Sequence, residues 1–160
     1  MHYDNWTWRD GHVDPSRAIV FDMDGVLSDA SRRQHYLDRP FRDWEAFFQA
    51  CGDDELIDEV ARLLDVIDDD LQVVLLTARP IRVQPQTLAW LRRYELRWDL
   101  LIMRDFGDYS ASQEFKRRSV WELRTEGFDL LLAFEDDRRN YEMFHSEGIP
   151  CVYIHSGYYD

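Results

Sequence analysis

Five short apolar runs recur along the chain and predict the strands of a sheet. Each run is continuous rather than alternating in polarity, as expected for strands that are buried on both faces. The runs cover residues 18–21, 72–76, 100–103, 130–134 and 151–154. Because helical patterns separate them, the sequence predicts an α/β domain built on a five-stranded parallel sheet.

The segments between these runs predict the covering helices. Apolar residues at helical spacing form one stripe from Leu56 to Ile67, which predicts the crossover helix between the first two strands. Later helices are predicted over residues 86–95, 113–125 and 138–146. Gly127 and Gly148 follow the last two of these and are expected to terminate them.

Two segments fall outside this alternation. Residues 31–54 are longer than a strand-to-helix connection needs, so we expect a small cap inserted above the sheet. Residues 1–16 are expected to form an irregular arm, and the sequence assigns no role to its Trp6 and Trp8. With 160 residues in all, the chain has about the length of one domain. We therefore expect residues 1–160 to form a single domain.

Charge and composition narrow the functional classes. A net charge of −13 argues against binding long nucleic acid by wide phosphate neutralisation, so any polynucleotide contact is expected to be local. No apolar run is long enough to cross a bilayer, and the N-terminus lacks the pattern of a signal peptide. Cys51 and Cys151 form no metal-binding spacing and are expected to be free thiols. These features predict a cytoplasmic protein without membrane contact, and they indicate no oligomeric state.

Two aspartates follow the first predicted strand. Asp22 stands at its carboxyl end and Asp24 comes two residues later, with Gly25 allowing a sharp turn. Two neighbouring carboxylates are costly to ionise together without a cation, and oxygen ligands favour Mg²⁺. One carboxylate could attack phosphorus while the other handles the proton of the leaving group. A polar turn is the alternative, whereas a calcium loop is excluded because its glycine and glutamate positions hold Leu27 and Arg33.

Further polar groups stand at corresponding places later in the chain. Thr77 and Arg79 end the second strand, where a hydroxyl and a guanidinium could bind phosphate. Lys116, early in a predicted helix, could neutralise charge on a transferring phosphoryl group. The acidic residues 135–137 end the fourth strand, where they could bind metal or cap the next helix. Because open parallel sheets bind ligands outside the carboxyl ends of their strands, we expect all these groups to meet there.

Together these segments resemble the four ordered motifs of the haloacid dehalogenase superfamily. The matching segments are DMDGV, LLTARP, Lys116 and FEDDRRN. The resemblance implies a Rossmann-like sheet ordered third, second, first, fourth, fifth, and a phospho-aspartate intermediate. It implies that Asp22 is the nucleophile and that Asp24 is the acid/base, with its backbone carbonyl on Mg²⁺. Asp24 also favours a phosphatase, since the dehalogenase and phosphonatase branches lack this second aspartate.

The same resemblance assigns the remaining positions residue by residue. Thr77 and Lys116 match the phosphate-binding positions of the superfamily. Asp136 and Asp137 match the acidic pair that completes the metal site together with Asp22.

The cap and the third strand are also similar to the 3′-phosphatase domain of polynucleotide kinase-phosphatases. The similar segments are HYLDRPFRDWEAFFQAC and LLIMRDFGDY. This similarity implies that Arg33 in the cap and Arg79 help to hold the substrate. Where that family usually reads GDxRxDxxVK, this chain has Ser110 and Ser112 at the arginine and aspartate positions.

The sequence therefore predicts a Mg²⁺-dependent phosphomonoester hydrolase that acts on a nucleotide or on a nucleic-acid 3′ end. A phosphatase of free nucleotides or other small metabolites is an alternative, and a non-catalytic binding module with the same fold is another. No kinase motif of the GxxxxGK[ST] type occurs in these residues.

Overall fold

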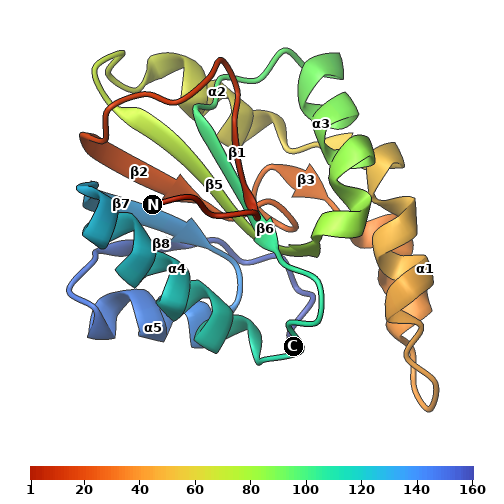
Figure 1. Ribbon diagram of the computed structural model, residues 1–160. Helices are drawn as coiled ribbons and strands as arrows, with labels where there is room; N and C mark the ends of the chain where they lie inside the picture. The colour runs from red at the N-terminus through yellow and green to blue at the C-terminus, as the bar shows by residue number, and fades with distance from the viewer.

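Each of the five predicted apolar runs forms a strand in the computed structural model, which describes residues 1–160. All five are parallel to their neighbours, in the order β6-β5-β2-β7-β8 (Figure 1). The strands are β2 (Arg17–Phe21), β5 (Gln72–Pro80), β6 (Leu100–Arg104), β7 (Asp129–Glu135) and β8 (Cys151–Tyr153). The predicted order of third, second, first, fourth and fifth is confirmed.

The N-terminal segment is not irregular throughout, as the sequence had suggested. Trp6–Trp8 forms β1, which pairs antiparallel with β6 and adds a sixth strand at the edge of the sheet. Trp6 and Trp8 are two residues apart and so share one face of this strand. Their rings pack against Phe128, with centroids 6.3 and 6.1 Å away. The arm thus extends the hydrophobic core.

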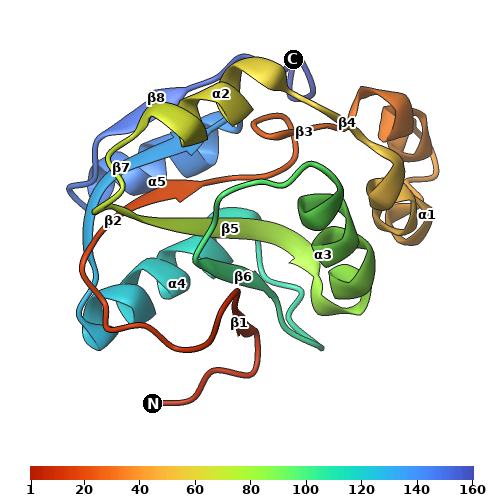
Figure 2. The same ribbon diagram turned by 90° about the horizontal axis from the view of Figure 1, so that it is seen from above.

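Two pairs of helices cover the two faces of the sheet (Figure 2). They are α2 (Asp58–Val66), α3 (Gln84–Arg93), α4 (Ser112–Glu126) and α5 (Arg138–Ser146). Side chains of α2 and α3 belong to one buried cluster, and those of α4 and α5 belong to another. Every boundary lies within two residues of its prediction, and Gly127 ends α4 in the left-handed conformation. None of the helices has the length and apolar character required to span a membrane.

The cap lies between β2 and α2, beyond the carboxyl ends of β2 and β5 (Figures 1 and 2). At its base, β3 (Ser28–Asp29) pairs antiparallel with β4 (Glu55–Leu56). Between them lie η1 (Ser31–Leu37), α1 (Trp44–Gln49) and η2 (Ala50–Asp53). A further turn, η3 (Ile81–Val83), joins β5 to α3. The insertion therefore stands over the edge of the sheet where the predicted site residues gather.

Candidate active site

The turn after β2 brings its aspartates against the loop after β7. The carbonyl oxygen of Met23 accepts the backbone N–H groups of residues 26, 27 and 28, which reverses the chain sharply. Gly25 lies in this turn at a φ of +82°, and a Cβ there would stand 2.1 Å from Asp136 Oδ2. Only glycine fits such a position. The absence of a side chain at Gly25 is what lets the two acidic segments come together.

Three buried carboxylates from these segments form one group. Oxygen atoms of Asp22, Glu135 and Asp136 lie within 4.8 Å of one another. Both oxygens of Asp136 and Oε1 of Glu135 are buried without a hydrogen-bond partner. Burial, followed by the charge of Asp22, raises the pKa of both Glu135 and Asp136 far above the usual carboxyl range. Such orphaned oxygens are what a divalent cation with oxygen ligands would satisfy, so the group fits Mg²⁺.

Lys116 supplies the one positive charge that contacts this group. It is the only lysine in the sequence, and its side chain is buried. Its Nζ donates to Asp22 Oδ1 at 2.9 Å and to Glu135 Oε2 at 2.7 Å. Burial would lower the pKa of Lys116, but the carboxylates of Asp22 and Glu135 outweigh it and raise that pKa. The ammonium is therefore charged and held against the predicted nucleophile.

Asp137 caps the helix that follows it, which is one of the two roles that the sequence left open for the acidic residues 135–137. Its Oδ1 accepts the backbone N–H of Arg139 at 2.9 Å, so Asp137 is the N-cap of α5. Its Oδ2 accepts a second hydrogen bond from Arg139 Nη2 at 2.9 Å. In the structure Asp137 caps α5, and Glu135 rather than Asp137 lies with Asp22 and Asp136 in the acidic group. The metal role that the resemblance implied for Asp137 stays a prediction.

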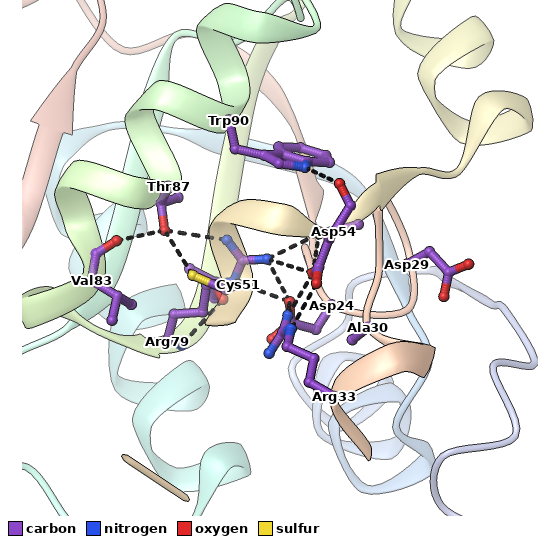
Figure 3. Close-up of polar contacts among 12 residues, drawn as sticks. Asp24, Asp29, Ala30, Arg33, Cys51, Asp54, Arg79, Val83, Thr87 and Trp90 are labelled. Carbon is purple, nitrogen blue, oxygen red and sulfur yellow. Dashed lines mark hydrogen bonds and ion pairs between the residues drawn. The ribbon is translucent and has the colours of Figure 1, made fainter. Parts of the chain in front are cut away.

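Asp24 is held by the two arginines that the sequence had singled out (Figure 3). Its Oδ1 accepts from Arg33 Nη2 at 2.6 Å and from Arg79 Nη2 and Nε at 2.7 and 3.0 Å. Burial would raise the pKa of Asp24, but the guanidiniums of Arg79 and Arg33 outweigh it and lower that pKa to about 2. Oδ2 accepts no hydrogen bond, and 19% of the Asp24 side chain remains exposed. One oxygen of the predicted acid/base is fixed and the other is free.

Asp54, a residue that the sequence analysis did not single out, holds the same two arginines from the other side (Figure 3). Its two oxygens accept from Arg33 Nε and Nη2 at 2.8 and 2.7 Å, and Oδ2 lies 3.4 Å from Arg79 Nη2. The hydroxyl of Ser28 donates to Asp54 Oδ2 at 2.5 Å. Two arginines and two aspartates therefore form a neutral buried cluster, which we call the arginine cluster. No motif marks Asp54, since its partners lie 21 and 25 residues away.

Arg33 and Arg79, which the family similarity implied as substrate contacts, both lie within the arginine cluster, and that role stays a prediction. Their side chains are 2% and 0% exposed, and their guanidiniums face Asp24 and Asp54. Arg79 Nη1 also donates to Thr87 Oγ1 at 3.2 Å. Both arginines are therefore buried, and both hold the acid/base residue by donating to Asp24 Oδ1.

The other predicted positions lie at the same edge of the sheet. Thr77 is buried in β5, and its hydroxyl oxygen accepts the backbone N–H of Arg79 at 3.2 Å. Ser110 lies in the loop before α4, where its carbonyl oxygen accepts from Arg104 Nη1 at 2.6 Å. Ser112 starts α4 and accepts from Asn140 Nδ2 at 3.2 Å. The two serines therefore have partners in neighbouring elements, Ser110 in β6 and Ser112 in α5.

Comparison with known families identifies the chain. The sequence profile of the polynucleotide kinase PNKP phosphatase domain matches residues 16–159. The chain belongs to this family. It is accordingly a phosphatase domain of the haloacid dehalogenase class. The comparison with curated proteins gave no match.

Solved structures agree with the PNKP phosphatase fold. A chain of the Pnkp1/Rnl/Hen1 RNA repair complex superposes with a TM-score of 0.74 at 24% identity, covering 97% of this chain and 47% of that chain. The PNKP-type domain thus spans about half the length of that relative. A class C acid phosphatase from Bacillus anthracis with tungstate bound has a TM-score of 0.60 at 18% identity, over 94% of this chain and 70% of that one. A HAD-like phosphatase from Mesorhizobium loti has a TM-score of 0.60 at 13% identity, over 90% and 75%.

Proposed function

We propose that this phosphatase is Mg²⁺-dependent and removes the phosphate from a nucleotide or nucleic-acid 3′ end through a phospho-aspartate at Asp22. The observation that carries the mechanism is the contact between Lys116 and Asp22 within the buried acidic group. It places a charged donor beside a carboxylate oxygen at the carboxyl end of β2. Ligands of open parallel sheets bind outside this end of the strands.

The first step of the proposed reaction is attack on phosphorus by a carboxylate oxygen of Asp22. A bond forms between this oxygen and phosphorus, and the bond from phosphorus to the leaving oxygen breaks. Lys116 is already charged and lies against Asp22, so it stabilises the negative charge that the phosphoryl group brings. Thr77, at the end of the buried part of β5, is proposed to donate its hydroxyl to the same phosphoryl group.

Asp24 is proposed to manage the protons of both steps. It gives a proton to the leaving oxygen in the first step and takes one from water in the second, when water attacks phosphorus and the bond to Asp22 breaks. Because the two guanidiniums keep Asp24 ionised in the free protein, the proposal requires that the negative charge of the bound phosphate raise its pKa before the first step. The arginine cluster fixes Oδ1 of Asp24 and leaves Oδ2 without a partner. This free oxygen is the atom at which we place the proton.

Asp22, Glu135 and Asp136 are the residues that would hold the metal. When bound, Mg²⁺ supplies charge that offsets these carboxylates and the phosphate. Lys116 alone leaves them under-compensated, since it contacts only Asp22 and Glu135.

The family description supports a polynucleotide as the substrate. A structural neighbour belongs to an RNA repair complex that contains Pnkp1, Rnl and Hen1. We extend this to the present chain as a proposal, in which the domain serves nucleic-acid repair in the cytoplasm, alone or beside partner proteins. We also propose that residues 1–160 form a single catalytic domain.

Comparison of four substrates at equal concentration and fixed salt tests the proposed substrate. They are a short 3′-phosphorylated oligonucleotide, its 5′-phosphorylated counterpart, a nucleoside 3′-monophosphate and a sugar phosphate. We expect faster phosphate release from either 3′-phosphate than from the other two. Much faster turnover of the 5′-phosphate or the sugar phosphate would replace the repair function with that of a metabolite phosphatase.

A further inference from the structure

Exposed aromatic side chains are concentrated at one end of this molecule. Six aromatic residues are classed as exposed: Phe41, Trp44, Phe106, Tyr109, Trp121 and Tyr159. All but Trp121 lie in the cap or in segments that follow the carboxyl end of a strand. Exposing large aromatic side chains to water is unfavourable. Several of them around one functional edge therefore indicate a surface that binds a ligand.

Four of these residues stand on the two segments that flank the catalytic edge. Phe41 and Trp44, 87% and 49% exposed, lie where the chain passes from η1 into α1 of the cap. Phe106 and Tyr109, 79% and 94% exposed, lie in the loop between β6 and α4. Both segments project beyond the carboxyl ends of the strands in the two views (Figures 1 and 2). We call these four residues the aromatic rim.

The position of the aromatic rim indicates what covers it. Asp22 directly follows β2, and both segments project beyond the same ends of the strands. We therefore take whatever rests on the rim to be the remainder of the substrate whose phosphate reaches Asp22. The substrate must therefore carry flat apolar groups next to its phosphate. Nucleobases are such groups, and they stack on aromatic side chains whatever their sequence.

Charge supports the same occupant. The cap segment 31–44 carries three exposed arginines and two exposed aspartates, since its fourth arginine, Arg33, is buried in the arginine cluster, whereas the whole chain has a net charge of −13. Arg39 and Arg42 are exposed on either side of Phe41. The local positive excess suits the sugar–phosphate backbone, but it is too small for binding by charge alone. Stacking has to supply most of the affinity in an acidic protein of this kind.

We propose that the aromatic rim binds the unpaired nucleobases next to the terminal phosphate of a single-stranded substrate. The proposal rests on the proposed function, since it takes a nucleic-acid end as the substrate. Binding through several bases requires that the end be unpaired, because the faces of bases within a duplex are already stacked on their neighbours.

An abasic substrate separates stacking from charge. Single strands of about six nucleotides with a 3′-phosphate are prepared with bases and, at the same number of phosphates, without them. We expect the wild-type enzyme to have a KM about tenfold lower for the strand with bases. The variants Phe41→Ala/Trp44→Ala and Phe106→Ala/Tyr109→Ala should each raise that KM by about tenfold and leave the KM for the abasic strand unchanged.

Trp121→Ala is the matched control. Trp121 is 56% exposed but lies on α4, where its Nε1 donates to Glu147. This variant should leave both KM values unchanged, and all variants should keep the wild-type kcat on a sugar phosphate. Equal KM values for the two strands in the wild-type enzyme, or an equal effect of Trp121→Ala, would overturn the proposal.

Direct binding keeps the aromatic rim testable if the proposed function fails. Fluorescence anisotropy of a labelled 3′-hydroxyl strand measures affinity without any hydrolysis. Tighter binding of the base-bearing strand that the rim variants abolish would support the rim even if only a sugar phosphate is hydrolysed. Equal binding of base-bearing and abasic strands would refute the rim while phosphatase activity toward 3′ ends could stand.

Discussion

Arg33 Nη2 lies 2.6 Å from Asp24 Oδ1, so a residue of the cap holds the predicted acid/base residue of the sheet. Asp54, which follows η2, holds the same guanidinium through two further hydrogen bonds. The cap therefore does more than cover the site. It contributes half of the arginine cluster, and its removal would leave Asp24 with Arg79 alone.

Asp54→Asn should impair catalysis although Asp54 is remote from the acidic group. The change leaves two buried guanidiniums with one carboxylate, which should cost about 3 kcal/mol of stability and displace Asp24. We expect kcat to fall by about tenfold or more below the unfolding temperature. Steady-state kinetics and thermal unfolding measure the two effects. The neighbouring Asp53 is exposed, so Asp53→Asn is the control, and equal kinetics for the two variants would contradict the role of Asp54.

Asp22→Asn should keep the fold and abolish turnover. An amide oxygen is a poor nucleophile and a weaker ligand for Mg²⁺, so kcat should fall by several orders of magnitude. Circular dichroism establishes folding, and phosphate release from a 3′-phosphorylated oligonucleotide measures activity. Near-native turnover in the folded variant would refute the phospho-aspartate mechanism.

Lys116→Met should lower activity strongly. Its effect on the free energy of unfolding of the metal-free protein should be smaller than the loss of two buried ion pairs would suggest. The ammonium offsets Asp22 and Glu135, and its loss leaves buried carboxylates that can take up protons instead. We expect kcat to fall by about a hundredfold or more. Activity measured at saturating Mg²⁺ checks this, and an unchanged kcat would exclude Lys116 from charge stabilisation.

Glu135→Gln and Asp136→Asn should weaken the binding of Mg²⁺, whereas Asp137→Asn should not. The first two remove carboxylates of the acidic group, while Asp137 only caps α5 and pairs with Arg139. We expect the Mg²⁺ concentration for half-maximal activity to rise more than about tenfold in the first two variants. Titration of chelator-treated enzyme with Mg²⁺ measures it. A similar rise in Asp137→Asn would show that Asp137 also binds the metal, as the resemblance implied.

The metal-free protein should become less stable as the pH rises. Burial and the charge of Asp22 raise the pKa of Glu135 to about 8, and that of Asp136 is raised as well. The folded state then binds more protons than the unfolded state, so the free energy of unfolding should fall between about pH 5 and pH 8. Mg²⁺ should flatten this decline because it replaces the protons. Urea titrations across this range, with Mg²⁺ and with chelator, test the expectation, and identical pH profiles would contradict it.

The sheet was predictable from the sequence because its strands are buried on both faces. Such strands are continuous apolar runs, and Val73, Val74 and Leu75 are all fully buried. β1 escaped prediction because three residues are too few to establish a period, although Trp6, Thr7 and Trp8 alternate in polarity. Its place depends on pairing with β6 almost a hundred residues later in the chain.

The site residues that directly follow a strand were predictable from the sequence. Residues whose position depends on contacts with distant parts of the chain were not. Asp22 and Lys116 meet as the superfamily resemblance implied. The sequence could not show which of residues 135–137 caps α5, because acidic residues serve equally as caps and as metal ligands. It could not reveal Asp54 either, since the contacts with Arg33 and Arg79 exist only after the cap has folded against β5.

The antiparallel strand β1 has a consequence for handling of the protein. Without Trp6–Trp8, β6 would present a row of unpaired backbone N–H and C=O groups along an apolar strand, which is a template for self-association. Shortened versions that begin at Arg17 would retain every residue of the catalytic edge and yet expose this row. For such versions aggregation, rather than loss of chemistry, is the foreseeable failure, and the first ten residues belong in any preparation meant for crystallisation.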